Sequence, residues 1–292
     1  MEKEENKETF DVNQGHGDHN DAVFGKGSEW IRAVLPECIA KGRLAWCAKE
    51  VPNRLGEDFP ERATLYAIKQ EQQDVGLLVL LGLSEAKKSN VVLSAYPECA
   101  GVPVEFVLDE VHEYSAGVEA VLSGRILGGK RDFSFFDTRY GLNKEKYKLG
   151  ETYTFMFAAL AYDADVLQKR TFSIGDDKAN EMRKAMGEKP EFEKDGSVKP
   201  LEFDMSRMVA SFQSSEAYPD DTEFQSPAYG LAARTAFEKD FHRLTIAIAL
   251  DECTGETVKI PLYARKELFS AAPRRNDPIR GHFWLHGYLK DV

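Results

Sequence analysis

Two short stretches with the same pattern constrain the fold of this chain more than any other feature. Residues 118–127 read VEAVLSGRIL and residues 282–290 read HFWLHGYLK, and both contain Leu-x-Gly followed by Arg or Tyr and then Ile or Leu. In both, apolar residues recur at every second position, which is the period of a β strand with one buried face. A glycine inside such a strand is typical of a bend in a sheet. We therefore predict two matching strands that bend at Gly124 and Gly287.

The segments that precede these two strands also match each other. Residues 76–83 (GLLVLLGL) and 244–250 (LTIAIAL) are apolar runs, and each is followed by a polar turn and a second strand-like run. This order predicts an internal duplication of a β unit that is too long to be a solenoid repeat. The alternative is a chance likeness, because any two β hairpins with polar turns resemble each other.

Residues 1–27 are acidic and poor in apolar side chains. Such a composition cannot bury enough surface to offset the entropy of ordering, so we predict a disordered tail. His16, Asp18, His19 and Asp21 offer metal-ligand groups within this tail. A flexible polar segment is the favoured interpretation, because no rigid element would hold the ligands in place.

The remainder of the chain divides at a segment rich in Gly, Pro and charged residues. Short helices are also expected from Ser28 to about Leu35, where Pro36 would bend or end the helix, and at residues 176–186 and 205–214. The predicted units are the tail at 1–27, a first β domain with extra strands and a helix at 28–186, a linker at 187–203 and a second β domain at 204–292.

Many short strands separated by turns indicate a mainly β, α+β fold made of two OB-like β barrels in tandem. Residues 122–162 (LSGRILGGKRDFSFFDTRYGLNKEKYKLGETYTFMFAALAY) and 281–289 (GHFWLHGYL) are similar to stretches in uncharacterised bacterial proteins with OB-fold-like β barrels. Together with the strand pattern, the resemblance covers about half of the chain. It implies a fold, and it carries over no catalytic residue.

Charge and hydropathy exclude several classes of protein. The formal net charge of −11 argues against a general nucleic-acid coat protein, because phosphate contacts need Lys and Arg. No apolar run reaches the roughly 18 residues of a membrane-spanning helix, and the charged first residues differ from a secretory signal. We therefore predict a cytoplasmic protein without membrane contact. The four cysteines form no CxxC pair, which favours buried free thiols, and no metal or cofactor is predicted.

The sequence contains no motif that names a reaction. GxxxxGK[ST], GxSxG and HExxH are all absent. His282 and His286 are four residues apart, and on a strand this places them roughly 13 Å apart, too far for one metal ion. Adjacent acids stand beside turn residues and are interpreted as solvated turn acids rather than as an acid–base pair. These pairs are Asp109-Glu110, Asp176-Asp177, Asp220-Asp221 and Asp251-Glu252.

The face of the last strand opposite to its apolar face carries large amphipathic side chains. Its members are His282, Trp284, His286 and Tyr288. Such residues concentrate at protein interfaces, so this face is the predicted binding surface, with another protein or a second copy of the chain as partner. The alternative is that a helix near the N-terminus covers Trp284. The leading hypothesis for function is thus a non-catalytic binding or adaptor protein.

Single-stranded nucleic-acid recognition is the second hypothesis. Residues 125–150 and 258–290 combine basic side chains with aromatic ones, and a basic groove with stacking platforms is how OB-type barrels hold single strands. The side chains that would make these contacts are Lys130, Arg131, Arg139, Tyr140, Lys144, Arg274 and Arg275, together with Trp284. The alternatives are that Phe133, Phe135 and Phe136 belong to the core and that the cations are solvated. An enzyme with a site assembled in space is the third hypothesis.

Overall fold

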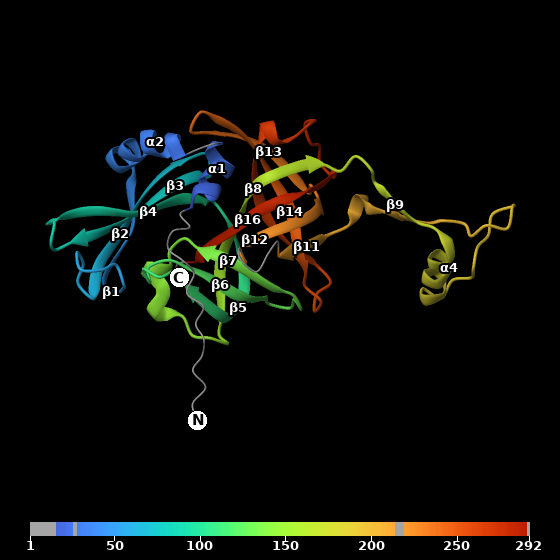
Figure 1. Cartoon of the computed structure of the whole chain (residues 1–292), viewed down its shortest axis with the longest axis horizontal. Coiled ribbons are helices and arrows are strands. Elements are labelled where there is room, and N and C mark those ends of the chain that lie inside the picture. The colour runs from blue at the N-terminus through green and yellow to red at the C-terminus, as the bar shows by residue number, and fades with distance from the viewer. Residues whose placement is uncertain (1–15, 26–27, 214–218, 291–292) are drawn as a thin grey trace, which may run out of the picture.

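The computed structural model describes residues 16–25, 28–213 and 219–290, and over these residues the chain is mainly β. The described segments form sixteen β strands, four α helices and three short 3-10 helices (Figure 1). The helices are α1 (Gly17–Phe24), α2 (Ser28–Lys41), α3 (Tyr140–Asn143), α4 (Asp176–Ala185), η1 (Lys144–Lys146), η2 (Met205–Arg207) and η3 (Lys266–Leu268). None of the helices in these segments is both long and apolar enough to cross a membrane.

Five strands close into a β barrel. They follow one another around the barrel as β5 (Val102–Glu113), β6 (Ala120–Ile126), β7 (Asp132–Asp137), β16 (Pro278–Leu289) and β8 (Thr152–Val166), and β8 returns to β5. Strands β7 and β16 are parallel, whereas the other four pairings are antiparallel. Closure leaves no unpaired edge between these five strands.

Phenylalanine rings fill the barrel. Phe135 packs edge-on against Phe106 and Phe157, with ring centroids 5.3 and 4.6 Å apart, a geometry that aromatic quadrupoles favour. Gly124 lies opposite a bulge in β5, where a Cβ atom would come within 2.0 Å of the Val107 carbonyl oxygen. The aromatic strand at 132–137 contributes to the core, because Phe133, Phe135 and Phe136 are all buried, as the alternative to the nucleic-acid hypothesis predicted.

Strands β8 and β16 are long enough to extend beyond the barrel and carry five more strands. On one side β16 pairs with β12 (Asp221–Pro227), and β12 with β11 (Ala210–Gln213). On the other side β8 pairs with β15 (Thr257–Arg265), followed by β14 (Lys239–Leu250) and β13 (Gly230–Ala236). All ten strands form one sheet. Within this sheet, strands that precede the predicted linker at 187–203 pair with strands that follow it. The division of the chain into domains stays a prediction.

A separate four-stranded antiparallel sheet packs beside the barrel. It contains β1 (Arg43–Pro52), β2 (Arg62–Gln72), β3 (Val75–Ser84) and β4 (Ser89–Cys99). The run at 76–83 thus lies in this sheet, whereas its supposed match at 244–250 lies in the ten-stranded one. Because the matched segments have different strand partners, the structure does not support the predicted repeat.

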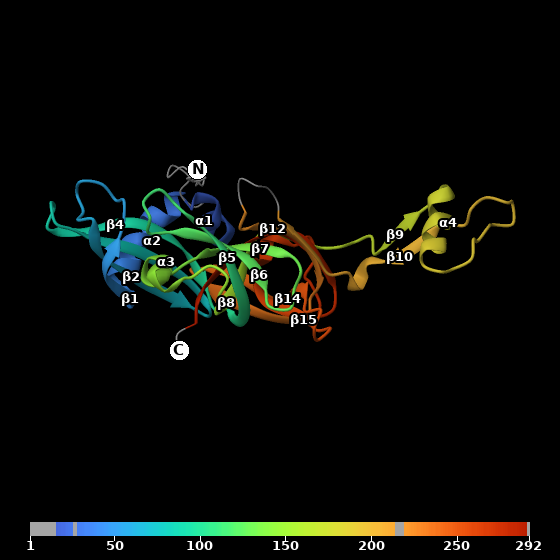
Figure 2. The same cartoon turned by 90° about the horizontal axis from the view of Figure 1, so that it is seen from below.

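Residues 167–204 leave the body as an arm, visible at the right of Figures 1 and 2. It consists of α4 and a two-stranded sheet formed by β9 (Thr171–Ile174) and β10 (Leu201–Asp204). Arg183 is buried inside it and donates hydrogen bonds to the carbonyl oxygens of Lys199 (2.7 Å) and Pro200 (3.0 Å). The helix predicted at 176–186 is thereby confirmed.

Two predictions of local structure were wrong. Residues 17–24 of the supposed disordered tail form α1, which buries Val23 and Phe24 in the core; residues 1–15 and 26–27 lie outside the described residues. The apolar contacts of two such side chains outweigh the acidic composition around them. The helix predicted at 205–214 is replaced by η2 and β11, because residues 210–213 pair with β12 at the edge of the sheet.

Candidate functional site

Helix α1 fills the space between the barrel and the four-stranded sheet. His19 on this helix stacks on the Trp284 ring of β16, with ring centroids 4.0 Å apart and planes inclined by 11°. Asn20, the next residue of the helix, donates a hydrogen bond to the Ala95 carbonyl oxygen of β4 at 3.2 Å. The helix is therefore held from both sides, and its outer side can form the wall of a cavity.

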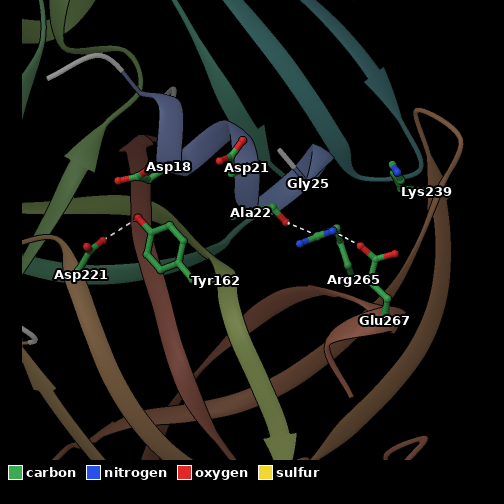
Figure 3. Close-up of a pocket in the computed structure, with 9 residues that line it drawn as sticks. All are labelled: Asp18, Asp21, Ala22, Gly25, Tyr162, Asp221, Lys239, Arg265 and Glu267. Carbon is green, nitrogen blue, oxygen red and sulfur yellow. Dashed lines mark hydrogen bonds and ion pairs between the residues drawn. The ribbon is translucent and has the colours of Figure 1, made fainter. Parts of the chain in front are cut away.

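A cavity of about 740 Å³ lies where α1 meets the ends of β8, β12 and β15 (Figure 3). This volume is within the range of small-molecule pockets in proteins. The lining residues are Asp18, Asp21, Ala22, Gly25, Tyr162, Asp221, Lys239, Arg265 and Glu267. Four of them carry carboxyl groups and two carry cations, so the pocket has an excess of negative charge.

Asp221 and Tyr162 form the centre of the acidic end of the pocket. The Tyr162 hydroxyl group donates a hydrogen bond of 2.7 Å to Asp221 Oδ1, as Figure 3 shows. Burial, with a smaller contribution from the neighbouring carboxyl group of Asp220, raises the pKa of Asp221 to about 7, although the tyrosine hydrogen bond acts in the other direction. Within the described residues, no ion pair reaches Asp221 or Asp18. The acidic end thus lacks a cation of its own.

Asp220, the residue before Asp221, carries a second buried carboxyl group. Asp220 is buried and accepts a hydrogen bond of 2.7 Å from Trp284 Nε1. Burial raises the pKa of Asp220, since its strongest partner is a neutral indole N–H. Burial also lowers the pKa of His19 well below its usual range, so His19 supplies no positive charge to balance these acids.

The opposite end of the pocket is closer to electrical balance. Arg265 donates a hydrogen bond to the Ala22 carbonyl oxygen at 3.2 Å and forms an ion pair with Glu267. Lys239 lies beyond them at the start of β14 (Figure 3). The unbalanced charge of the pocket is therefore located at Asp18 and Asp221.

The predicted binding face of β16 lies largely inside the protein. The alternation of the strand is as predicted, because Phe283 and Leu285 enter the barrel core while Trp284 points to the other side. Trp284 and His286 are fully buried, however, under α1 and the four-stranded sheet, and His286 Nε2 accepts a hydrogen bond of 3.0 Å from the Cys99 backbone N–H. The alternative prediction, that a helix near the N-terminus covers Trp284, describes the structure. The covering helix is α1 and not the helix that begins at Ser28.

The two outer members of this face keep some exposure and have charged partners. His282 is paired with Asp163, with 2.8 Å between His282 Nδ1 and Asp163 Oδ2. The guanidinium group of Arg139 lies 3.8 Å from the centre of the Tyr288 ring. No four-residue contact surface is exposed on β16.

The structure distributes the predicted nucleic-acid contacts among separate places. Lys130 pairs with Glu252, and Arg131 donates to the Ser211 carbonyl oxygen, both beside the β14–β15 turn and β11. At another place, Lys144 pairs with Glu113 at 2.6 Å and the Tyr140 hydroxyl group donates to the same carboxylate.

The other predicted cations lie elsewhere. Arg139 pairs with the buried Glu98, and Arg274 and Arg275 are exposed in the loop before β16. Carboxylates already pair with Lys130, Arg139 and Lys144, and single-strand recognition by these residues stays a prediction.

Sequence reasoning missed the central acid pair of the pocket. Asp220 and Asp221 were interpreted as solvated turn acids, yet Asp220 is only 4 % exposed. The available signal was weak: Thr222, Phe224 and Ser226 alternate with Glu223 and Gln225. In the structure these three residues are the buried side of β12, and Asp221 at its start pairs in register with Trp284.

The candidate metal and thiol residues have structural contacts. His16 contacts His19 (Nδ1 to Nδ1, 3.0 Å) and Glu119 (3.0 Å), and no group of three or more His, Cys, Asp or Glu side chains in the described segments is arranged to hold a metal ion. Cys38 and Cys99 are buried as predicted, whereas Cys47 and Cys253 are exposed. Comparison of the chain with protein-family models, with curated proteins and with solved structures found no match.

Proposed function

We propose that the protein is a non-catalytic binding protein whose pocket beside α1 takes an organic cation, through an ammonium or guanidinium group. The observation that carries the proposal is the pair of carboxyl groups at one end of the pocket, Asp18 and Asp221, which have no cationic partner among the described residues. A half-buried carboxylate without a counter-charge is costly, and a cationic ligand removes that cost.

The chemistry around Asp221 suits such a ligand. A carboxylate and a cation form a charge-assisted hydrogen bond, which is stronger than a bond between neutral groups. The Tyr162 ring also lines the pocket, and a cation is attracted to the face of an aromatic ring. Bound cations lower the pKa of a neighbouring carboxyl group, so binding and ionisation of Asp221 support each other.

A basic side chain of a protein partner carries the same chemical group as a free amine. The sequence-based prediction of an adaptor that binds another protein is therefore retained as a proposal, now with the pocket in place of the β16 face. An OB-like character of the five-stranded barrel likewise stays a prediction. Acid–base catalysis at Asp221 is a second candidate, because a pKa of about 7 suits proton transfer.

Calorimetric titration tests the proposal with 1,5-diaminopentane and with a short lysine-containing peptide as probes. Both are expected to bind, and Asp221→Asn is expected to weaken binding about tenfold, the value of one charge-assisted contact. Asp177→Asn, an exposed acid on the arm, is the matched control and should bind like the parent. Preference for the peptide would favour the adaptor, and chemical conversion of the bound amine would favour the enzyme.

The pH dependence provides an independent check. Because the carboxylate is the binding form and the pKa of Asp221 is about 7, affinity should rise with pH up to about 7 and level off above it. In Asp221→Asn this rise should disappear. Affinity that is independent of pH in the parent protein, or lack of binding by both probes, would contradict the proposal.

A further inference from the structure

A second cavity, lined by other residues, has the opposite charge. Its volume is about 370 Å³, and it lies where the end of α2 and strands β1 and β2 meet the residues that follow β7. The lining residues are Lys41, Arg43, Leu44, Ala45, Lys69, Gln70, Glu71 and Arg139. Four cations thus face the cavity together with one carboxylate.

A buried carboxylate fixes two of these cations. Glu98 on β4 is fully buried, and it lies 3.1 Å from Lys69 Nζ and 3.0 Å from Arg139 Nη2. Thr138 donates a further hydrogen bond of 2.5 Å to Glu98. Both cationic side chains are only 14 % exposed, so they are held at the wall of the cavity before any ligand arrives.

The strand register adds a cation that the neighbouring acids do not balance. Arg43 on β1 lies directly opposite Lys69 on β2, and like charges at directly opposite positions destabilise a sheet. Lys41 pairs with Glu37, and Lys69 pairs with both Glu71 and Glu98. In the described part of the chain, no ion pair reaches Arg43, and this residue therefore gives the cavity a net positive charge.

We propose that this cavity binds a phosphate group, either as inorganic phosphate or as the phosphomonoester of a small molecule. A tetrahedral oxyanion can accept hydrogen bonds from several directions, and Arg43, Lys69 and Arg139 approach the cavity from three different segments. The guanidinium fork of Arg43 faces no protein acid, and a phosphate oxygen pair is a geometric match for it. The volume also accommodates a small organic group attached to the phosphate.

Calorimetric titration at low ionic strength, with inorganic phosphate, ribose 5-phosphate and acetate as probes, tests this site. The expected results are binding of at least one phosphate compound, weaker binding of acetate, and a loss of about tenfold in phosphate affinity for Arg43→Gln. Tighter binding of ribose 5-phosphate would identify a phosphomonoester, and equal binding would identify the phosphate group alone. Arg207→Gln, which removes the same charge from an exposed position on η2, should leave phosphate binding unchanged.

The variants separate a built site from general electrostatic attraction. Arg43 is exposed and is not part of the buried Glu98 cluster, and its replacement relieves the like-charge pair with Lys69, so Arg43→Gln is expected to unfold at the same or a slightly higher urea concentration than the parent. The proposal fails if neither phosphate compound binds, if acetate binds as tightly as phosphate, or if Arg43→Gln and Arg207→Gln weaken binding equally. Its failure would leave the cation pocket beside α1 untouched, because the two sites share no residue.

Discussion

The cation pocket beside α1 and the basic pocket beside β1 and β2 are each built beside a carboxyl group, but the two groups have opposite surroundings. Glu98 is paired with Lys69 and Arg139, and these cations hold its pKa at about 2 although burial acts in the other direction. Asp221 has a tyrosine hydroxyl group as its hydrogen-bond donor, and burial raises its pKa to about 7. One carboxylate is thus ionised at every physiological pH, whereas the other is half protonated near neutrality.

Under the two proposals, this difference would sort ligands by charge. The acid of the basic pocket is fully used within the protein, and the charge left for a ligand there is the positive one of Arg43. The acid of the pocket beside α1 is not used in this way, and the charge left for a ligand is negative. The net charge of −11 for the whole chain predicts neither pocket.

The largest expected effect comes from removing the two carboxylates in turn. At pH 8, Glu98→Gln should lower the free energy of unfolding by about 3 kcal/mol, because it leaves buried cations without their partner. Asp221→Asn should instead raise the free energy of unfolding, because the amide avoids the cost of burying an unpaired charge and still accepts the Tyr162 hydrogen bond. Urea denaturation of both variants measures the effect, and equal destabilisation would remove the contrast.

The two acids should also give opposite dependences on pH. The folded pKa of Glu98 lies below its unfolded value of 4.5, so its contribution is complete above pH 4.5 and is lost as the pH falls toward 2. The folded pKa of Asp221 lies above its unfolded value of 3.8, so its contribution declines as the pH rises from 3.8 to about 7.

Urea midpoints recorded across this pH range for the parent and both variants measure the two slopes. The acid-side loss should disappear in Glu98→Gln, and the decline toward pH 7 should disappear in Asp221→Asn. If either variant keeps the slope of the parent, the titrating group has been assigned to the wrong residue.

The smallest effect should come from Asp18, the exposed acid of the cation pocket. Exposed ion pairs contribute about 0.2–1 kcal/mol, so Asp18→Asn should weaken binding of 1,5-diaminopentane only about twofold to threefold. This loss should vanish at high salt, which screens exposed charges more than buried ones. A tenfold loss at Asp18 in calorimetry would instead make it the principal anchor and Asp221 a structural residue.

The sequence was informative where the evidence is local. The period-two pattern of residues 282–290 placed Phe283 and Leu285 in the barrel core and Trp284 on the other side, because alternation depends only on neighbouring residues. It was misleading where large amphipathic residues were equated with a surface. Trp284 and His286 are buried because α1 covers them, and α1 belongs to a segment whose composition predicts disorder.

Neither pocket could be read from the chain, because each depends on pairings between distant residues. Tyr162 and Asp221 are 59 positions apart, and Arg139 and Glu98 are 41 positions apart. The barrel itself was partly predictable from the many strand-like runs separated by turns. The sharing of β8 and β16 between two groups of strands was not, since it follows from strand length and register in three dimensions.

That sharing sets an order of events during synthesis of the chain. The barrel needs β16 between β7 and β8, but β8 ends at residue 166 and β16 at residue 289, so 289 − 166 = 123 further residues must be translated first. At about 5–20 residues per second this takes roughly 6 to 25 seconds. During this interval β7 and β8 have exposed edges, which are the surfaces that chaperones protect. A nascent chain arrested after residue 204 should therefore be sensitive to protease across β5–β8 until the last strand arrives.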